Sequence, residues 1–82
     1  MSILVTGASA GFGRAICRTL AAAGYRVIGA ARRADKLDEL RAELGANFLP
    51  LQMDVGDPTS VDAALKGLPE NFARIDCLVN NA

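Results

Sequence analysis

A glycine-rich segment lies between an apolar run and a helical pattern near the start of this chain of 82 residues. Residues 6–13 read TGASAGFG, follow the apolar residues 3–5, and lead into a helical pattern near Arg14. Glycine permits a sharp turn and a close approach of the backbone to a ligand, and the start of a helix attracts an anion. The segment therefore predicts a phosphate-binding turn. The alternative is a turn that serves only the packing of the helix on the strand.

The spacing of these glycines is G-x-x-x-G-x-G, which differs from the G-x-x-x-x-G-K-[ST] loop of nucleoside triphosphatases. Arg14 and Ala15 follow the last glycine, so the lysine and hydroxyl that hold phosphates and magnesium in that loop are missing. Nucleotide hydrolysis is therefore not supported.

The composition is that of a small globular unit with an aliphatic core. Hydrophobic residues make up 51% of the chain, but only three Phe and one Tyr are aromatic. Nine basic and nine acidic residues are interspersed, so no basic patch favours nucleic acid or a membrane surface. No apolar run approaches the roughly 20 residues of a membrane span, and the N-terminus lacks the charged start of a signal peptide. We expect a cytoplasmic protein with neither nucleic acid nor membrane as partner.

Cys17 and Cys77 are the only cysteines, and the chain has no histidine. No metal site is expected from so few ligands, and a disulfide is not expected in a reducing compartment. Both cysteines are predicted to be small core residues.

Apolar periodicity predicts strands alternating with helices. The expected strands cover residues 2–6, 25–30, 48–55 and 75–79, and the expected helices cover residues 13–23, 34–44 and 58–68. Asp57 and Pro58 predict the N-cap and first residue of the third helix. The residues expected to face the core are, helix by helix, Phe12, Ile16, Leu20 and Ala23; Leu37, Leu40 and Leu44; and Val61, Leu65 and Leu68.

Pro50 determines the expected order of the strands, because proline cannot donate to a sheet ladder and belongs on an edge strand. Right-handed crossovers then favour a parallel sheet in the order 3-2-1-4. The predicted fold class is α/β, half of a doubly wound Rossmann fold with three helices, formed by residues 1–82 as one unit.

Three motifs together resemble the short-chain dehydrogenase/reductase family. Residues 6–13 match T-G-x-x-x-G-x-G, Asp54 and Val55 match a later Asp-Val, and residues 80–82 match the start of N-N-A-G. With residues 31–33 (ARR) and 36–40 (KLDEL), the pattern looks most like the NADP-dependent 3-hydroxy acid dehydrogenases of this family. The resemblance implies a parent enzyme that transfers a hydride between NADP(H) and a hydroxyl or carbonyl substrate.

The resemblance also implies a set of cofactor-binding residues. They are Gly7, Ala8, Ser9, Ala10, Gly11, Phe12, Arg32, Arg33, Asp54, Val55 and Asn81. In this scheme Asp54 accepts a hydrogen bond from the adenine amino group, the Val55 backbone lies beside it, and Asn81 meets the ribose. Asp54 could instead be an N-cap or loop carboxylate, and the Asn81 side chain could bond loop backbone.

The residues that follow the second strand favour NADP(H) over NAD(H). An acidic residue there bonds the ribose hydroxyls of NAD, whereas an arginine accepts the 2′-phosphate of NADP. Ala31 stands at the acidic position, and Arg32 and Arg33 follow it. A guanidinium binds phosphate through paired, charge-assisted hydrogen bonds. The alternative is that both arginines only begin a solvated helix.

The chain has no catalytic residues of the kind that the family uses, namely a serine and a Tyr-x-x-x-Lys pair. Its one tyrosine, Tyr25, is followed four residues later by Gly29, and we expect Tyr25 in the core or an interface. The chain is therefore expected to be the cofactor-binding part of a longer enzyme, truncated before the catalytic part. A stand-alone NADP(H)-binding sensor or interaction module is the alternative. A sugar-nucleotide epimerase is disfavoured because its T-G-x-x-G-x-x-G motif needs glycine at Ala10.

The outer edge of the fourth strand, residues 75–79, is expected to have no partner within this chain. Unpaired strand edges with apolar surface template association with other chains. We therefore expect a homo-oligomer or association through this edge.

Overall fold

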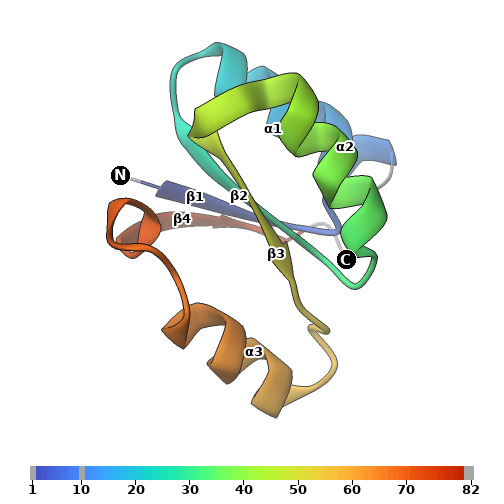
Figure 1. Cartoon of the computed structure of the whole chain (residues 1–82), viewed down its shortest axis with the longest axis vertical. Coiled ribbons are helices and arrows are strands. Elements are labelled where there is room, and N and C mark those ends of the chain that lie inside the picture. Colours follow the sequence, from blue (N-terminus) through green and yellow to red (C-terminus); the bar gives the residue numbers. More distant parts are fainter. Residues whose placement is uncertain (1, 10, 81–82) are drawn as a thin grey trace.

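The structure, a computed structural model, describes residues 2–9 and 11–80. Over these residues the chain forms a parallel four-stranded sheet in the order β3-β2-β1-β4 (Figure 1). The strands are β1 (Ser2–Thr6), β2 (Arg26–Ala31), β3 (Phe48–Gln52) and β4 (Ile75–Val79), and the helices are α1 (Gly11–Ala22), α2 (Ala34–Leu44) and α3 (Pro58–Lys66). The α/β class and the strand order predicted from the sequence are confirmed.

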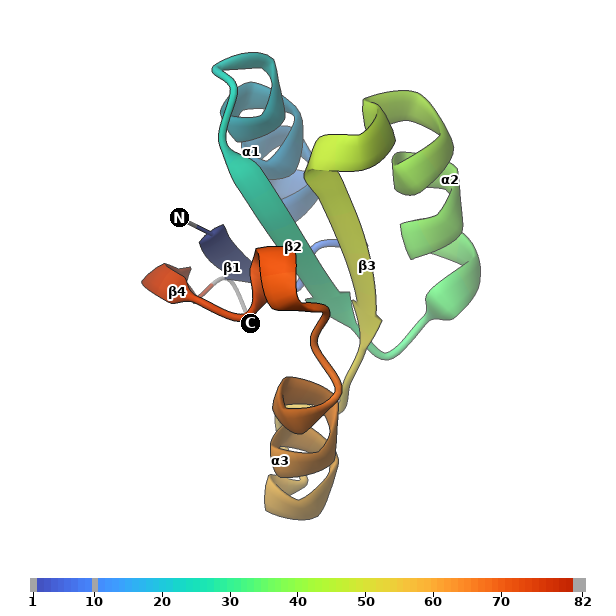
Figure 2. The same ribbon diagram turned by 60° about the vertical axis from the view of Figure 1, so that its left-hand side comes forward.

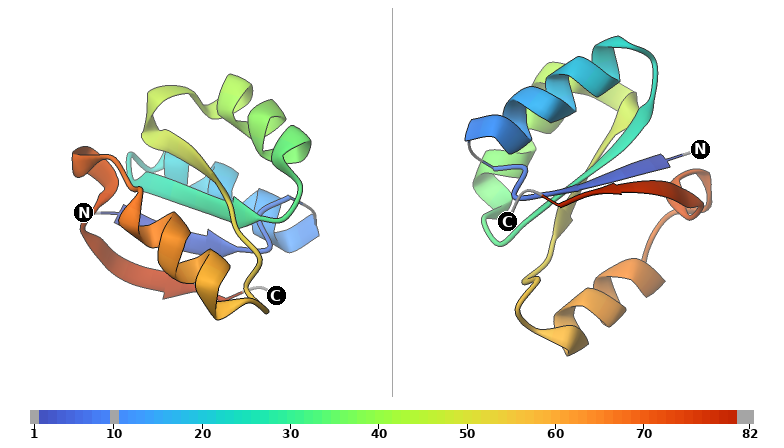
Figure 3. Two further views of the ribbon diagram at one scale, coloured as in Figure 1. Left: turned by 60° about the horizontal axis from the view of Figure 1, so that its bottom comes forward. Right: turned by 180° about the vertical axis from the view of Figure 1, so that it is seen from behind.

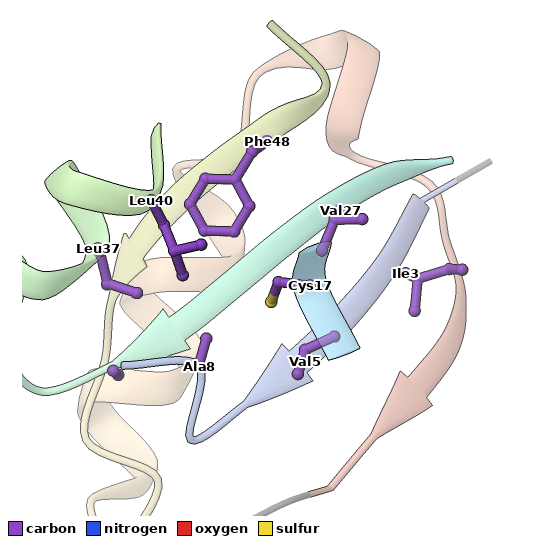
Figure 4. Close-up of a cluster of buried hydrophobic side chains, with 9 residues drawn as sticks. Ile3, Val5, Ala8, Cys17, Val27, Leu37, Leu40 and Phe48 are labelled. Atoms are coloured by element: carbon purple, nitrogen blue, oxygen red, sulfur yellow. The ribbon is translucent and has the colours of Figure 1, made fainter. Parts of the chain in front are cut away.

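The sheet separates two layers of helices. Helices α1 and α2 cover one face, and α3 covers the other (Figures 1 and 3). Successive residues of a strand point to opposite faces, so Val5 packs toward α1 and α2 while Leu4 packs in the cluster on the other face. The cluster under α1 and α2, drawn in Figure 4, contains Ile3, Val5, Ala8, Cys17, Val27, Ala31, Leu37, Leu40 and Phe48.

Strand β3 lies at one edge of the sheet, as Pro50 predicts. Pro50 is aligned with Gly29 of β2, and the opposite side of β3 has no partner strand among the described residues. Figure 2 shows β3 and β4 at the two sides of the twisted sheet. The edge position therefore tolerates the missing N–H of proline.

Gly29 of β2 provides room for the largest buried side chain. A Cβ built on Gly29 would lie 2.4 Å from Cζ and 2.5 Å from Cε1 of Phe48, and 3.1 Å from Cβ of Ala8. Phe48 is fully buried, so its ring fills the space that a side chain at Gly29 would need. The same contact brings the strand close to Ala8 of the glycine loop.

The helix boundaries agree with their capping residues. Asp57 caps α3 by accepting a 3.0 Å hydrogen bond from the Thr59 N–H, and Pro58 follows at the first helical position. Helix α2 covers residues 34–44 as predicted and is followed by Gly45, whose φ of 78° is left-handed.

The predicted inner face of α1 is wrong in part. Phe12 is 81% exposed and Ala23 is also exposed, whereas Gly13 and Cys17 are the buried residues of this helix. Ile16 and Leu20 pack against the core from its margin. The buried face of α1 is therefore the row of Gly13 and Cys17, and Phe12 lies outside it.

Two further predicted core positions are corrected. Leu65 of α3 is exposed, because the helix packs through Val61 and Ala64 with Leu68 just after it. Cys77 is exposed, unlike Cys17, because β4 is an edge strand that the described helices leave largely uncovered. Tyr25, expected in the core or an interface, precedes β2 and is exposed.

Strand β3 ends earlier than predicted. It stops at Gln52 rather than at Val55, because the chain turns away from β2 after the Met53 N–H donates to the Ala31 carbonyl at 2.9 Å. Residues 54–57 then form a turn closed by a 3.0 Å bond from the Asp57 N–H to the Asp54 carbonyl.

Candidate functional site

The loops that follow β1, β2 and β3 lie at the same end of the sheet, because the strands are parallel and their carboxyl ends point the same way. Figure 2 shows the β2 and β3 loops leaving the sheet at neighbouring points. The loops enclose an open cavity of about 350 Å³ lined by Gly7, Ser9, Ala30, Ala31, Arg32, Arg33, Met53, Asp54 and Val55. Six of the eleven residues predicted as cofactor-binding line this cavity.

The other five predicted residues do not line it. Ala8 is fully buried beneath the glycine loop, and Gly11 and Phe12 are exposed at the start of α1. Ala10 and Asn81 lie outside the described residues. Phe12 therefore does not line the cavity, and the predictions for Ala10 and Asn81 stay predictions.

Two glycines of the glycine loop have backbone conformations that favour glycine. Gly7 and Gly11 have φ angles of 64° and 54°, in the left-handed region that favours glycine. A Cβ at Gly11 would meet nothing within 4 Å, so the conformation, rather than crowding, requires glycine there. The Ala8 N–H donates to the Ala30 carbonyl at 3.1 Å, which anchors the loop on β2. Helix α1 begins at Gly11 and directs its N-terminal amides toward the loop.

A side-chain contact joins the end of β1 to the end of β4. The buried Thr6 hydroxyl donates to Oδ1 of Asn80 at 3.1 Å, and the Val79 carbonyl lies 3.5 Å from the same hydroxyl. Thr6 and Asn80 belong to the first and last of the three motifs. This contact therefore links Thr6 of the first motif to Asn80 of the last motif, where β1 and β4 end.

Arg32 and Arg33 line the cavity and stand between the end of β2 and the start of α2. Both side chains are exposed, and neither forms an ion pair with a described residue. By contrast, Arg14, Arg18 and Arg74 each pair with a carboxylate. Arg33 also occupies the N-cap position of α2 without a capping side-chain bond. Two unpaired cations beside the start of a helix form a site suited to an anion.

Asp54 lines the same cavity as the arginines, and its side chain is held by its own turn. Its Oδ1 accepts from the Gly56 N–H at 3.0 Å, and its N–H donates to Oγ of Ser60 at 3.1 Å. The N-cap of α3 is Asp57, so Asp54 is not the N-cap that the alternative interpretation allowed. Asp54 is a loop carboxylate at the cavity wall, beside the exposed Val55.

Sequence reasoning missed Gln52 and Ser60. Both line a second, polar cavity of about 330 Å³ that shares Arg32, Met53 and Asp54 with the first. Neither residue belongs to a motif, and each acts on a backbone group of a wall residue. The available signals were a polar residue closing an apolar strand and a serine in the first turn of a helix.

The chain's one tyrosine, Tyr25, does not line the cavity. Tyr25 precedes β2 and so lies at the opposite end of that strand. Burial raises the pKa of the Cys17 thiol to about 11, which keeps it protonated. The described residues contain no group of three or more His, Cys, Asp or Glu side chains placed to hold a metal ion. Nor does that part of the chain contain a helix of the length and apolarity that crossing a membrane requires.

Comparisons with known proteins agree with this geometry. The family model described as short chain dehydrogenase matches residues 1–82. A probable NADP-dependent dehydrogenase of Haemophilus influenzae is 57% identical over 79 residues, which cover 96% of this chain and 31% of that protein. Serine 3-dehydrogenase of Agrobacterium fabrum is 47% identical over 81 residues, covering 99% of this chain and 32% of that protein.

A solved structure of serine dehydrogenase complexed with NADP+ has a TM-score of 0.97 and 45% identity, and the match covers 100% of this chain and 33% of that one. The chain therefore spans about a third of the length of each of these three proteins. The family model, the identities and the coincident sheet topology confirm the resemblance seen in the motifs: the chain belongs to the short-chain dehydrogenase family.

Proposed function

We propose that this chain is the NADP(H)-binding half-domain of a dehydrogenase, residues 1–82 preceding a catalytic part. The parent protein would transfer a hydride between NADP(H) and a hydroxyl or carbonyl group of its substrate. The observation that carries the proposal is that Arg32 and Arg33, which form no ion pair with a described residue, line the same cavity as Gly7 and Ser9 of the glycine loop. A cytoplasmic location is part of this proposal.

The residues present fit a dinucleotide with a 2′-phosphate. The glycine loop and the α1 N-terminus would hold the pyrophosphate, and Arg32 and Arg33 would hold the 2′-phosphate. Asp54 and Val55 would border the adenine, and Asn81 would meet the ribose. When bound, NADP(H) supplies the hydride, and the residues of this chain bind and orient it.

Affinity for the two cofactors tests the proposal directly. The protein is titrated with NADPH and with NADH, following nicotinamide fluorescence. Arg32→Ala combined with Arg33→Ala should weaken NADPH binding by about 2–3 kcal/mol, because two charge-assisted contacts are lost, and should leave NADH binding nearly unchanged. Arg41→Ala, which removes an exposed arginine of α2 outside the cavity, is the matched control. Equal affinity of the unsubstituted protein for both cofactors would contradict the proposal.

The substrate class that we propose is a 3-hydroxy acid such as serine. Relatives named serine 3-dehydrogenase and NADP-dependent 3-hydroxy acid dehydrogenase, the latter from Escherichia coli and 45% identical over 82 residues, support it. Because the chain has no Tyr-x-x-x-Lys pair, the 82 residues alone should bind cofactor without turnover. NADPH formation from NADP+ and serine by these residues alone would reveal a catalytic group among them.

We also propose that the outer edge of β4 is an association surface. Leu78 is 60% exposed, and Asp76 and Cys77 are exposed beside it. Within the described ranges β4 pairs only with β1, so its other side presents free backbone groups. Leu78→Lys should disrupt self-association or folding, which light scattering and thermal unfolding can measure. A monomer at high concentration before any substitution would refute this.

A further inference from the structure

Gln52 contacts the backbone of the arginine pair from a neighbouring strand. Its Nε2 donates to the carbonyl oxygen of Arg32 at 3.2 Å. Gln52 is the last residue of β3 and is aligned with Ala31, the last residue of β2. The final backbone bond between the two strands runs from the Met53 N–H to the Ala31 carbonyl. The Gln52 side chain therefore extends the pairing one residue beyond the ladder, to the point where the strands diverge.

The carbonyl of Arg32 belongs to the peptide group that joins Arg32 to Arg33. Holding this carbonyl restrains ψ of Arg32 and φ of Arg33, and so fixes the direction in which both side chains leave the backbone. Arg33 is at the extended N-cap position of α2, with φ of −98° and ψ of 102°, and makes no capping side-chain bond that would hold it. The bond from Gln52 is thus a restraint on both cations at once.

Ser60 acts in the same way on Asp54, another residue that lines the cavity. Its hydroxyl, in the first turn of α3, accepts from the Asp54 N–H at 3.1 Å. Under the proposed function Asp54 would border the adenine, which NADPH and NADH share, whereas Arg32 and Arg33 would meet the 2′-phosphate. The two bonds therefore restrain different parts of the site.

We propose that Gln52 is a positioning residue for cofactor discrimination, holding the Arg32–Arg33 peptide so that both guanidinium groups meet a 2′-phosphate, while Ser60 positions Asp54 for either cofactor. This inference rests on the proposed function. Loss of the Gln52 bond should raise the cost of ordering the two arginines around the phosphate, and it should not affect a cofactor that lacks the phosphate.

Three substitutions test the proposal in fluorescence titrations of the protein with NADPH and NADH. Gln52→Met keeps the length of the side chain and removes its donor, and it should raise the dissociation constant for NADPH about 3- to 10-fold while NADH binding stays the same. Ser60→Ala should raise both dissociation constants by similar factors. Asn47→Ala removes an exposed amide at a site away from both cavities and should change neither.

Hydrogen exchange provides a readout that does not depend on bound cofactor. Gln52→Met should speed exchange of the Arg33 and Ala34 amides and leave the core amides of β2, such as Ile28, unchanged. The positioning role is refuted if the unsubstituted protein prefers NADPH but Gln52→Met leaves NADPH affinity unchanged. It is also refuted if Gln52→Met weakens binding of both cofactors equally. An unsubstituted protein without that preference would instead refute the proposed function.

Discussion

Gly29→Ala should be among the most destabilising single-methyl additions in this chain. The new Cβ would lie 2.4 and 2.5 Å from two ring carbons of Phe48, distances that real Cβ atoms essentially never show. The ring is fully buried between the sheet and α2, and Ala8 closes the third side at 3.1 Å. Overpacking of this kind costs about 1–3 kcal/mol, and we expect the upper end because no partner can move into solvent. About 3 kcal/mol corresponds to a fall of about 12–24 °C in Tm for a domain of this size.

Urea unfolding followed by circular dichroism measures the loss, with Gly67→Ala as the matched control. Gly67 has φ of −86°, and a Cβ there would lie 3.6 Å from the nearest atom, the Ala63 carbonyl oxygen. The same substitution should therefore be neutral or stabilise by up to about 1 kcal/mol, since alanine restricts the unfolded chain.

A double-mutant cycle with Phe48→Leu isolates the steric contact. Phe48→Leu alone lowers stability because it removes buried apolar contacts, but it also opens the space that the new methyl needs. Gly29→Ala should then cost less in the Phe48→Leu background than in the native one, with a coupling energy of about 1–2 kcal/mol. Costs that add to within about 0.3 kcal/mol would refute the reasoning.

Three further predictions concern caps and thiols. Burial raises the pKa of Cys17 from 9.0 to about 11, so the thiol ionises at lower pH in the unfolded chain than in the folded one. The free energy of unfolding should therefore fall between pH 9 and pH 11. Urea unfolding of Cys17→Ala should lack the part of this fall that the thiol causes. Asp57→Ala should lower stability by about 1 kcal/mol in thermal unfolding because the Thr59 N–H loses its acceptor, and Asp57→Asn should lose less. Iodoacetamide should label the exposed Cys77 in the native protein and the buried Cys17 only in urea, as mass spectrometry can show; equal labelling rates would contradict the burial.

Sheet topology was predictable because its signals are local and reinforce one another. Apolar runs separated by helical periods specify a parallel sheet, and Pro50 excludes the third strand from the interior. Right-handed crossovers then leave few arrangements, of which the observed order is one. The N-cap at Asp57 followed from residue chemistry alone.

The inner face of α1 was not predictable in the same way. Periodicity ranks positions by apolarity, so Phe12 seemed a core residue, but how large an inward side chain can be depends on how closely the helix approaches the sheet. That distance is a property of the packed fold. The buried residues of α1 are Gly13 and Cys17. The end of β3 likewise depends on where the chain separates from β2. No single residue between Gln52 and Val55 marks that point in the sequence.

Some residues of the candidate site could be predicted from the sequence, and others could not. Glycines, arginines and an aspartate have side-chain or backbone chemistry that suggests a ligand, and the structure brings Gly7, Arg32 and Asp54 to one cavity. Gln52 and Ser60 act on backbone groups of residues distant in sequence, by 20 and 6 positions. The Gln52 contact exists only once β2 and β3 are paired, so motif reasoning could not find it, whereas the Ser60 contact depends on how the loop after β3 meets the first turn of α3.

Strand β2 connects the stability of the fold to the geometry of the site. The glycine loop is anchored on it through the bond from the Ala8 N–H to the Ala30 carbonyl, and the arginines follow its last residue. Gly29 adjoins Ala30, and the methyl group that would collide with Phe48 would also lie 3.1 Å from the Cβ of Ala8. A shift of β2 that relieves the first contact must therefore move the glycine loop as well. Substitution of Gly29 should consequently weaken cofactor binding in protein that remains folded, although Gly29 lines neither cavity.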